Sequence, residues 1–329
     1  MSNTPTAPRT ESTGPESVRP VAAGSSASEG RALLVIGAAL AEELYSVVDV
    51  PPRGGHAWMS HIASTVGGSA FNVLRNLVRL GHAPMAALAV GTGPAATRVT
   101  KKLDALGVRS VLPKHEQDNG TCLTLVTPDA ERTFLTVGGC ETDWSAQRLA
   151  GLEAPTGAVV YISGFQLVAV GGHLAEWSAR LHPDARLVID PGARCAELVQ
   201  LPGWRALSDR CDLLTLNTRE AAVLLGAEPG YECPKDPGTG LETGLAGWAQ
   251  RHGCDVVLRR GPAGATWLPA DGSGPVHAQA VPVRVVDTDG AGDAHTAGIM
   301  AALAGGVGPK AALELAAEAA AQVVARVGP

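Results

Sequence analysis

The sequence has no segment that is long and apolar enough to cross a membrane. None of its apolar runs approaches the roughly 20 residues that a membrane-spanning helix needs. Its first residues also lack the positive charge followed by an apolar run that marks a secretory signal peptide. These absences argue against a membrane protein or a secreted one, and we expect a cytoplasmic protein without a membrane partner.

Positive charge and paired cysteines are scarce as well. The chain holds 26 Lys and Arg against 32 Asp and Glu, a net charge of −6, and it contains no basic run. This balance argues against nucleic acid as the main partner. The six cysteines include no Cys-x-x-Cys pair, so we expect reduced thiols and neither a disulfide framework nor a zinc site.

Several catalytic motifs are missing. There is no GxxxxGK[ST] loop, which excludes a phosphotransferase of the Walker type. Neither an HExxH zinc motif nor a GxSxG nucleophile elbow occurs. Any catalytic chemistry must therefore come from other residues.

The remaining sequence is typical of one α/β domain with an N-terminal tail. Residues 1–30 are rich in Ser, Thr, Pro, Gly and Ala, and this composition predicts a disordered tail. From residue 31 to 329, predicted strands and helices alternate, which favours a mostly parallel sheet flanked by helices. Residues 41–66 and 118–137 break this alternation and predict short strands that stand off the main sheet.

The most informative stretch runs from Val285 to Ala304. It predicts a strand end, a loop of small residues at Gly290, Ala291 and Gly292, and then a helix with Asp293 in its first turn. Free N–H groups at a helix N-terminus attract anions, and small residues let a phosphate approach the backbone. Asp293 can be a simple helix cap. However, a carboxylate beside phosphate-binding amides is also what phosphoryl transfer to an alcohol requires.

Two further patterns carry candidate polar residues. Gly67 and Gly68 form a turn before a helix that contains Asn72, which by itself predicts no more than a glycine turn. Asn217 ends a buried strand and Glu220 follows three residues later, at the sheet edge where α/β proteins bind ligands. The alternative for this pair is an N-cap with a capping-box acid.

These motifs resemble those of a known family. The stretch DTDGAGD resembles DTxGAGD, the second signature of the ribokinase-like (PfkB) carbohydrate and nucleoside kinases. The glycine turn with Asn72 resembles the first region of that family, GGxxxN, and the pair 217–220 resembles its NxxE motif. The DNG, PDxERTF, SGxQL and GAGDxH patterns are most similar to a bacterial branch described only as sugar kinases. The resemblance covers nearly all of residues 31–329, and it implies a ribokinase-like fold with a small β lid formed by residues 41–66 and 118–137.

The resemblance also implies roles on the acceptor side. Asp293 would be the catalytic base, and the amides of Ala291, Gly292 and Asp293 would hold the developing phosphate charge. The residues that would contact the acceptor are Gly67, Gly68, Asn72, His295 and Glu42, the last at the place of a family Asp that grips two sugar hydroxyls. A solvated lid position is the alternative for Glu42, and a helix residue bonded to a backbone carbonyl is the alternative for His295.

On the nucleotide side, the resemblance implies ATP and Mg²⁺. Asn217 and Glu220 would organise phosphate, with Glu220 acting on the metal through water. Asp287 would pin the glycine loop and assist the metal or cation shell. The strand–turn–strand segment near residue 260 would contribute Gly261 and Gly264, with Arg259 and Arg260 as either phosphate ligands or solvated arginines.

The C-terminal helix departs from the family pattern. Ala317 stands where family members carry an adenine-side Asn, and the chain ends at Pro329. This departure leaves the nucleotide contacts and the monovalent-cation site of the family open for this chain.

Taken together, the sequence predicts an ATP-dependent kinase that phosphorylates a hydroxyl of a sugar or sugar derivative. A nucleoside kinase of the same fold, and a catalytically silent relative that binds a sugar or nucleoside, are the alternatives. A homodimer formed through the lid is a further expectation.

Overall fold

We analysed a computed structural model, which describes residues 30–129, 131–169, 172–227 and 238–326. The predicted disordered tail, residues 1–30, therefore lies outside the described residues except for Gly30. Five cysteines in the described part of the chain are buried and free.

An eight-stranded sheet forms the centre of the molecule. Its strands lie in the order β12-β11-β10-β9-β8-β7-β1-β4, with six parallel strands and an antiparallel edge made by β11 and β12. The strands are β1 (Leu33–Gly37), β4 (Met85–Leu88), β7 (Val159–Ser163), β8 (Arg186–Asp190), β9 (Leu213–Asn217), β10 (Asp255–Arg259), β11 (Ala265–Leu268) and β12 (Val276–Ala278).

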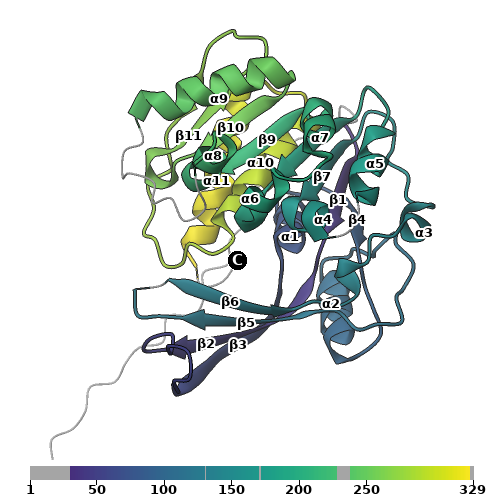
Figure 1. The fold of residues 1–329 in the computed structure, drawn as a ribbon, viewed down its shortest axis with the longest axis vertical. Coiled ribbons are helices and arrows are strands. Elements are labelled where there is room, and N and C mark those ends of the chain that lie inside the picture. Colours follow the sequence, from purple (N-terminus) through teal and green to yellow (C-terminus); the bar gives the residue numbers. More distant parts are fainter. Residues whose placement is uncertain (1–29, 130, 170–171, 228–237, 327–329) are drawn as a thin grey trace, which may run out of the picture.

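Helices cover both faces of this sheet (Figure 1). One face packs on α1 (Ser69–Arg79), α2 (Pro94–Ala105), α10 (Ala291–Ala304) and α11 (Pro309–Val324). The opposite face packs on α3 (Ala146–Leu149), α4 (Gly164–Ala169), α5 (His173–Ala179), α6 (Cys195–Leu198), α7 (Trp204–Arg210), α8 (Thr218–Leu224) and α9 (Gly238–His252). Three short 3₁₀ turns, η1 (Cys140–Thr142), η2 (Gly192–Arg194) and η3 (Gly261–Ala263), lie in the connections.

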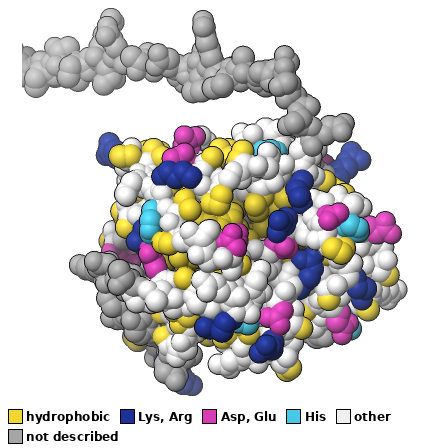
Figure 2. Space-filling view, turned by 90° about the horizontal axis from the view of Figure 1, so that it is seen from above, with side chains coloured by type: hydrophobic (Ala, Val, Ile, Leu, Met, Phe, Trp, Pro, Cys, Tyr) yellow, Lys and Arg dark blue, Asp and Glu magenta, His cyan; other side chains and the backbone are white. Residues whose placement is uncertain are grey.

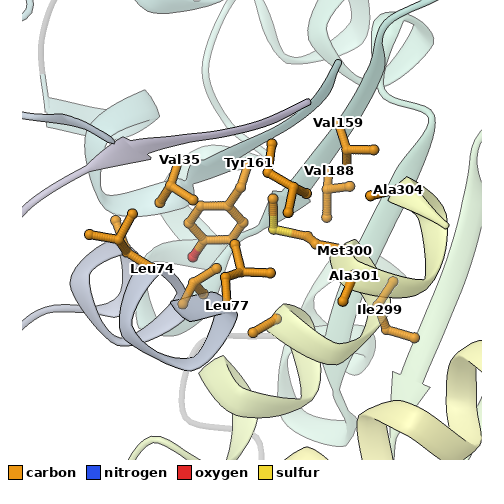
Figure 3. Close-up of a cluster of buried hydrophobic side chains, with 14 of the residues drawn as sticks. Val35, Leu74, Leu77, Val159, Tyr161, Val188, Ile299, Met300, Ala301 and Ala304 are labelled. Atoms are coloured by element: carbon orange, nitrogen blue, oxygen red, sulfur yellow. The ribbon is translucent and has the colours of Figure 1, made fainter. Parts of the chain in front are cut away.

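The hydrophobic core fixes α1 against α10. Figure 3 shows Leu74 and Leu77 of α1 and Met300 of α10 gathered around Tyr161 of β7. Each of these side chains is fully buried, so their contacts exclude water from the space between the two helices and the sheet. This packing sets the position of one helix N-terminus relative to the other.

A second, four-stranded sheet stands below the main body in Figure 1. Its strands lie in the order β3-β2-β5-β6, where β2 and β5 are parallel and the two outer pairs are antiparallel. We call it the lid sheet; it consists of β2 (Leu40–Val47), β3 (Met59–Gly67), β5 (Thr121–Val126) and β6 (Arg132–Val137). The architecture is the predicted one, a mostly parallel sheet flanked by helices with a small second sheet.

The parallel strands bring their carboxyl ends to one edge. Ser163 of β7 pairs with Asp190 of β8, and Asn217 of β9 pairs with Arg259 of β10. On the surface away from the lid sheet, basic, acidic and hydrophobic side chains are interspersed (Figure 2). Asn217 and Arg259, two of the predicted site residues, therefore lie at the carboxyl edge of the sheet, where ligands bind in open α/β sheets.

Within the described residues, no helix combines the length and the apolar character required to cross a bilayer.

Candidate active site

The loop of small residues ends in a helix start without a side-chain cap. Gly290 has φ of 70°, a left-handed conformation that favours glycine, and it is the N-cap residue of α10. The Ala291 amide bonds the Thr288 carbonyl at 3.3 Å, whereas the amides of Gly292 and Asp293 have no partner among the described residues. Two of the three predicted anion-binding amides are thus free to bind an anion.

Asp293 lies beside these amides and is held by α1. Its Oδ2 accepts a hydrogen bond from Asn72 Nδ2 at 2.8 Å, a contact between residues 221 positions apart. Burial raises the pKa of Asp293 to about 7, with the nearby Asp190 adding to the rise while the Asn72 hydrogen bond opposes it. A carboxylate with this pKa can accept a proton near neutral pH.

The orientation of Asn72 is fixed by a residue that the sequence analysis missed. Arg75 donates from Nη2 to Asn72 Oδ1 at 2.9 Å, so the amide group of Asn72 is left facing Asp293. Both residues lie on α1, three positions apart and therefore on one helix face. Helical spacing could have identified Arg75, but only once Asn72 was placed in the site.

Beneath the loop, Arg259 joins several elements. Its Nη1 donates to Asp190 Oδ2 at 2.7 Å and to the carbonyl oxygen of Gly292 at 3.1 Å. Its Nη2 lies 3.4 Å from Glu220 Oε2, and Thr296 bonds both Arg259 and Asp190 at 3.1 Å. The guanidinium is 12% exposed, so these contacts hold the glycine loop over the strand ends with little competition from water.

Asn217 and Glu220 make the capping box that was the alternative reading of their spacing. Glu220 donates its amide to Asn217 Oδ1 at 2.9 Å, and its carboxylate accepts from the Asn217 amide at 2.8 Å. Burial, and then the charge of Asp190, raises the pKa of Glu220 above its ordinary value. The cap therefore does not remove Glu220 from the site, because its carboxylate stays at the same edge as Arg259.

Glu42 lies on the lid sheet, buried against the glycine turn. Its side chain accepts from Thr124 Oγ1 at 2.5 Å, and a Cβ added to Gly67 would lie 2.2 Å from its Oε2. Burial raises the pKa of Glu42. Gly67 must be glycine for this close approach, and Gly68, with φ of 106°, turns the chain into α1.

A second lid residue, Arg132 on β6, contacts the glycine loop. It donates to Asp287 Oδ2 at 2.5 Å and to Asp289 Oδ2 at 2.9 Å. Asp287 Oδ1 also accepts the amide of Asp289 at 3.0 Å, a hydrogen bond within the loop. The lid sheet is thus tied to the segment that leads into the free amides.

Gly261 and Gly264 form the turn between β10 and β11. Both have positive φ, 56° and 84°, and a Cβ on Gly264 would lie 2.0 Å from the carbonyl oxygen of Ala278. Close backbone packing explains Gly264 without a ligand. Neither glycine shows by itself that a nucleotide binds there.

His295 is buried on α10 and has no hydrogen-bond partner among the described residues. Burial lowers its pKa to about 3, with Arg259 adding to the effect. His295 is therefore neutral at physiological pH. His295 lies three residues before Gly298 on α10. Because Gly298 packs against Ala316 of α11, His295 lies on the side of α10 that faces α11.

Negative charge outweighs positive charge at this edge. Asp190, Glu220 and Asp293 surround one guanidinium, that of Arg259. A divalent cation held mainly by phosphate oxygens and water fits such an excess. Among the described residues, no group of three or more His, Cys, Asp and Glu side chains is placed to hold a metal ion.

The fold and this edge are those of an α/β phosphotransferase class without a Walker loop. A buried carboxylate and free amides share the first turn of a helix at the carboxyl ends of parallel strands. A family model agrees. The description "pfkB family carbohydrate kinase" matches residues 31–329, and the chain belongs to this family.

Related proteins support the same assignment. The chain is 33% identical over 278 residues to the uncharacterized sugar kinase YegV of Escherichia coli (strain K12), covering 84% of this chain and 83% of that protein. The fold is similar to that of a ribokinase from Cryptococcus neoformans var. grubii serotype A in complex with ADP. The TM-score is 0.76, the two sequences are 17% identical, and the match covers 92% of this chain and 95% of that chain. It is also similar to an adenosine kinase from Sinorhizobium meliloti, with a TM-score of 0.71, 20% identity, and 91% and 95% coverage.

These comparisons confirm the predicted family and the ribokinase-like fold. The protein is a phosphotransferase that acts on an alcohol group of a sugar, and ATP binding follows from the family.

Proposed function

We propose that this protein transfers the γ-phosphoryl group of ATP to a hydroxyl of a free sugar or sugar derivative, with Asp293 as the general base. One observation carries the proposal. The Asp293 carboxylate and the free amides of Gly292 and Asp293 share one helical turn, so a proton acceptor and anion donors face the same space. This pair of features is what in-line phosphoryl transfer to an alcohol requires.

In this mechanism, Asp293 accepts the proton of the acceptor hydroxyl as its oxygen attacks the γ-phosphorus and the bond to ADP breaks. Asn72 holds the carboxylate in place through the 2.8 Å hydrogen bond, and Arg75 holds Asn72. The free amides stabilise the charge that develops on the transferred group. A silent relative has no need of a base with its pKa raised to about 7 beside such amides.

On the nucleotide side, Asn217, Glu220, Gly261 and Gly264 occupy one stretch of the same edge, next to β9 and β10. Mg²⁺ would neutralise phosphate charge when bound, and Glu220 would hold it through water. Arg259 supports this part of the site by fixing Gly292 and Glu220, since its guanidinium is already bonded within the protein. A direct contact of Arg259 with phosphate stays a prediction.

For the acceptor, we favour a sugar over a nucleoside because the lid offers little aromatic surface. Tyr45 already contacts the ring of His61, with 5.3 Å between ring centroids. Trp58 and Phe134 are 86% and 53% exposed to solvent. Glu42, buried against Gly67, supplies a carboxylate that can accept two neighbouring hydroxyls.

Exposed apolar side chains on both faces of the lid sheet support the expected homodimer. Apolar side chains that are largely exposed on β3, on β6 and in the segment before β3 are Trp58, Met59, Ile62, Phe134, Leu135 and Val137. A second copy of the chain is the occupant that would cover them, because each lid sheet ends in an edge strand with free backbone groups.

The experiment is a panel of free pentoses, hexoses, sugar acids and nucleosides incubated with ATP and Mg²⁺, with products identified by mass. The proposal predicts a phosphorylated sugar and ADP in equal amounts. Phosphorylation of nucleosides with no activity on any sugar would favour the nucleoside kinase. ATP turnover on none of the acceptors, together with sugar binding, would favour a silent relative.

A further inference from the structure

A glutamine outside the residues discussed so far has an unsatisfied side chain. Gln166 lies on α4, three residues beyond the end of β7, and is 5% exposed. Its Oε1 is buried without a hydrogen-bond partner among the described residues. A buried polar group without a partner costs its full desolvation penalty, so such groups in folded proteins call for a specific explanation.

The carboxamide lies at the carboxyl edge of the sheet. A Cβ added to Gly37, the last residue of β1, would lie 3.1 Å from Gln166 Oε1 and 2.3 Å from Ala70 Cβ. The oxygen is therefore wedged between the end of β1 and the first turn of α1. That same turn begins at Gly68 and contains Asn72, which bonds the base.

Glu42 and Gln166 approach this turn from two sides. Glu42 arrives from the lid sheet and contacts Gly67, whereas Gln166 arrives from the end of β7 and contacts Gly37. The chain that leaves β1 lies against the first turn of α1, since the Phe71 amide donates to the Ala38 carbonyl at 3.3 Å. The Glu42 carboxylate and the Gln166 carboxamide therefore both lie next to the chain segments around the start of α1.

Two fully buried hydroxyl groups without partners among the described residues lie in different surroundings. Tyr161 and Thr215 are fully buried and sit within strands of the main sheet. The Tyr161 hydroxyl points into the apolar space between the sheet and α1 (Figure 3). Gln166 differs because it lies beyond a strand end, at the edge where ligands of this fold class bind.

We propose that Gln166 is a specificity-determining residue that hydrogen-bonds a hydroxyl of the acceptor. This inference rests on the proposed function, since it assigns a contact within the acceptor site. A carboxamide offers both a donor and an acceptor, and a sugar hydroxyl does the same, so one hydroxyl can satisfy it. An apolar or deoxygenated group at that position would leave the carboxamide unpaired, and the site would discriminate against it.

The test compares Gln166→Leu with Gln147→Leu, a control on the exposed surface of α3. For the sugar that the wild type phosphorylates best, Gln166→Leu should raise the acceptor KM about tenfold or more. It should leave the ATP KM within about twofold, and the melting temperature without ligand should not fall, because leucine removes an unpaired polar group. The control should match the wild type in each measurement.

Deoxy analogues of the same sugar locate the contact. For one analogue, the wild type should lose as much affinity as Gln166→Leu loses with the parent sugar, and the variant should show no further loss. A variant that only perturbs the fold would weaken all analogues equally, and that result would overturn the inference. An unchanged acceptor KM would also overturn it.

Sugar-induced thermal shifts without ATP separate this inference from the proposed function. A wild type that shows a thermal shift with a sugar but never phosphorylates it would contradict the kinase mechanism. In that case, loss of the shift in Gln166→Leu would still support the contact. A wild-type protein that shifts with none of the sugars would overturn both.

Discussion

The main sheet and the lid sheet differ in how much of their surface is covered. Strands β1, β7 and β8 are buried along all or nearly all of their length, with helices on both faces. In the lid sheet, by contrast, β6 is exposed at five of its six positions, and most of β3 is exposed as well. Asp293 and the free amides lie on α10, which packs on the covered main sheet, whereas the proposed acceptor contact Glu42 lies on the lid sheet.

The ionic contacts of the two regions follow the same division. Arg259 is 12% exposed and binds carboxylates of the main body, Asp190 and Glu220. Arg132 has the same exposure but reaches from the lid to Asp287 and Asp289 in the glycine loop. The first cluster joins β8, α8 and β10 within the main body, and the second joins β6 of the lid sheet to the loop before α10.

The largest effect is expected from Arg259→Met. This change leaves the buried carboxylates of Asp190 and Glu220 without their cation, and breaking a buried pair in this way costs about 3–5 kcal/mol of unfolding free energy. Arg260→Met is the matched control, because Arg260 is 27% exposed and, among the described residues, forms an ion pair with Glu242. Denaturant unfolding of both variants is the measurement. Equal losses of unfolding free energy in the two variants would contradict the expectation that the more buried arginine contributes more to stability.

Glu42→Gln tests whether the lid sheet contacts the acceptor. The change removes a charged hydrogen-bond acceptor from the lid, and we expect the acceptor KM to rise about 10- to 100-fold while the ATP KM stays unchanged. The melting temperature should not fall, because burial raises the pKa of Glu42 and a neutral group avoids that cost.

The neighbouring acid provides the control for Glu42. Burial alone would raise the pKa of Glu43, but hydrogen bonds from Ser64 and Arg98 outweigh it and lower the pKa. Glu43→Gln should therefore leave the acceptor KM near the wild-type value. Similar acceptor KM values in the two variants would show that Glu42 does not contact the acceptor.

The pH dependence of kcat/KM should follow the titration of the proposed base, Asp293 on α10. Because the pKa of Asp293 is raised from 3.8 to about 7, kcat/KM should fall about tenfold per pH unit below that value. His295, with its pKa lowered to about 3, should contribute no step between pH 5 and 9, so His295→Phe should keep the same profile. Rate measurements across this range in the wild type and in His295→Phe check the assignment, and a profile that loses its acidic limb in the variant would contradict it.

The same shift has a consequence for stability. The folded protein holds a proton on Asp293 at pH values where the unfolded chain has released it. Between the ordinary pKa of 3.8 and about 7, this group therefore makes the free energy of unfolding fall as pH rises. Unfolding midpoints of the wild type should decline across this window more steeply than those of Asp293→Asn.

The smallest effect on catalysis is expected on the exposed face of the lid. Replacing Leu135 and Val137, which lie on the face of β6 opposite Arg132, by serine should convert the proposed dimer to a monomer in sedimentation, because it removes apolar surface that a partner would cover. The unfolding free energy of the monomer should change by no more than about 0.5 kcal/mol per site, as for other exposed positions. A wild-type protein that sediments as a monomer at all concentrations would exclude the dimer.

The fold could be predicted from the sequence because its signals are local. Buried strands such as β1 end in glycine turns, and the alternation of strands with helices fixes a parallel sheet. The glycine turn before Asn72 and the small-residue loop before Asp293 were visible for the same reason. Their contact was not, because the packing of α1 on α10 brings together residues 221 positions apart.

The missed residues show where local signals end. Asp190 ends a buried strand, as Asn217 does, and could have been found by the same argument. Arg132 could not, since its partners lie 155 and 157 residues away and no spacing records them. Gln166 became informative only through the absence of a partner in the folded chain.

Turnover and nucleotide binding by Asp293→Asn test the central claim most directly. The account predicts that kcat with the best sugar falls by about 10²–10⁴-fold or more, because the variant cannot accept the hydroxyl proton. The affinity for ADP, measured by calorimetry, should stay within about twofold of the wild type, because Asn217, Glu220 and the β10–β11 turn are untouched. A variant that keeps a tenth or more of wild-type turnover would show that Asp293 is not the base.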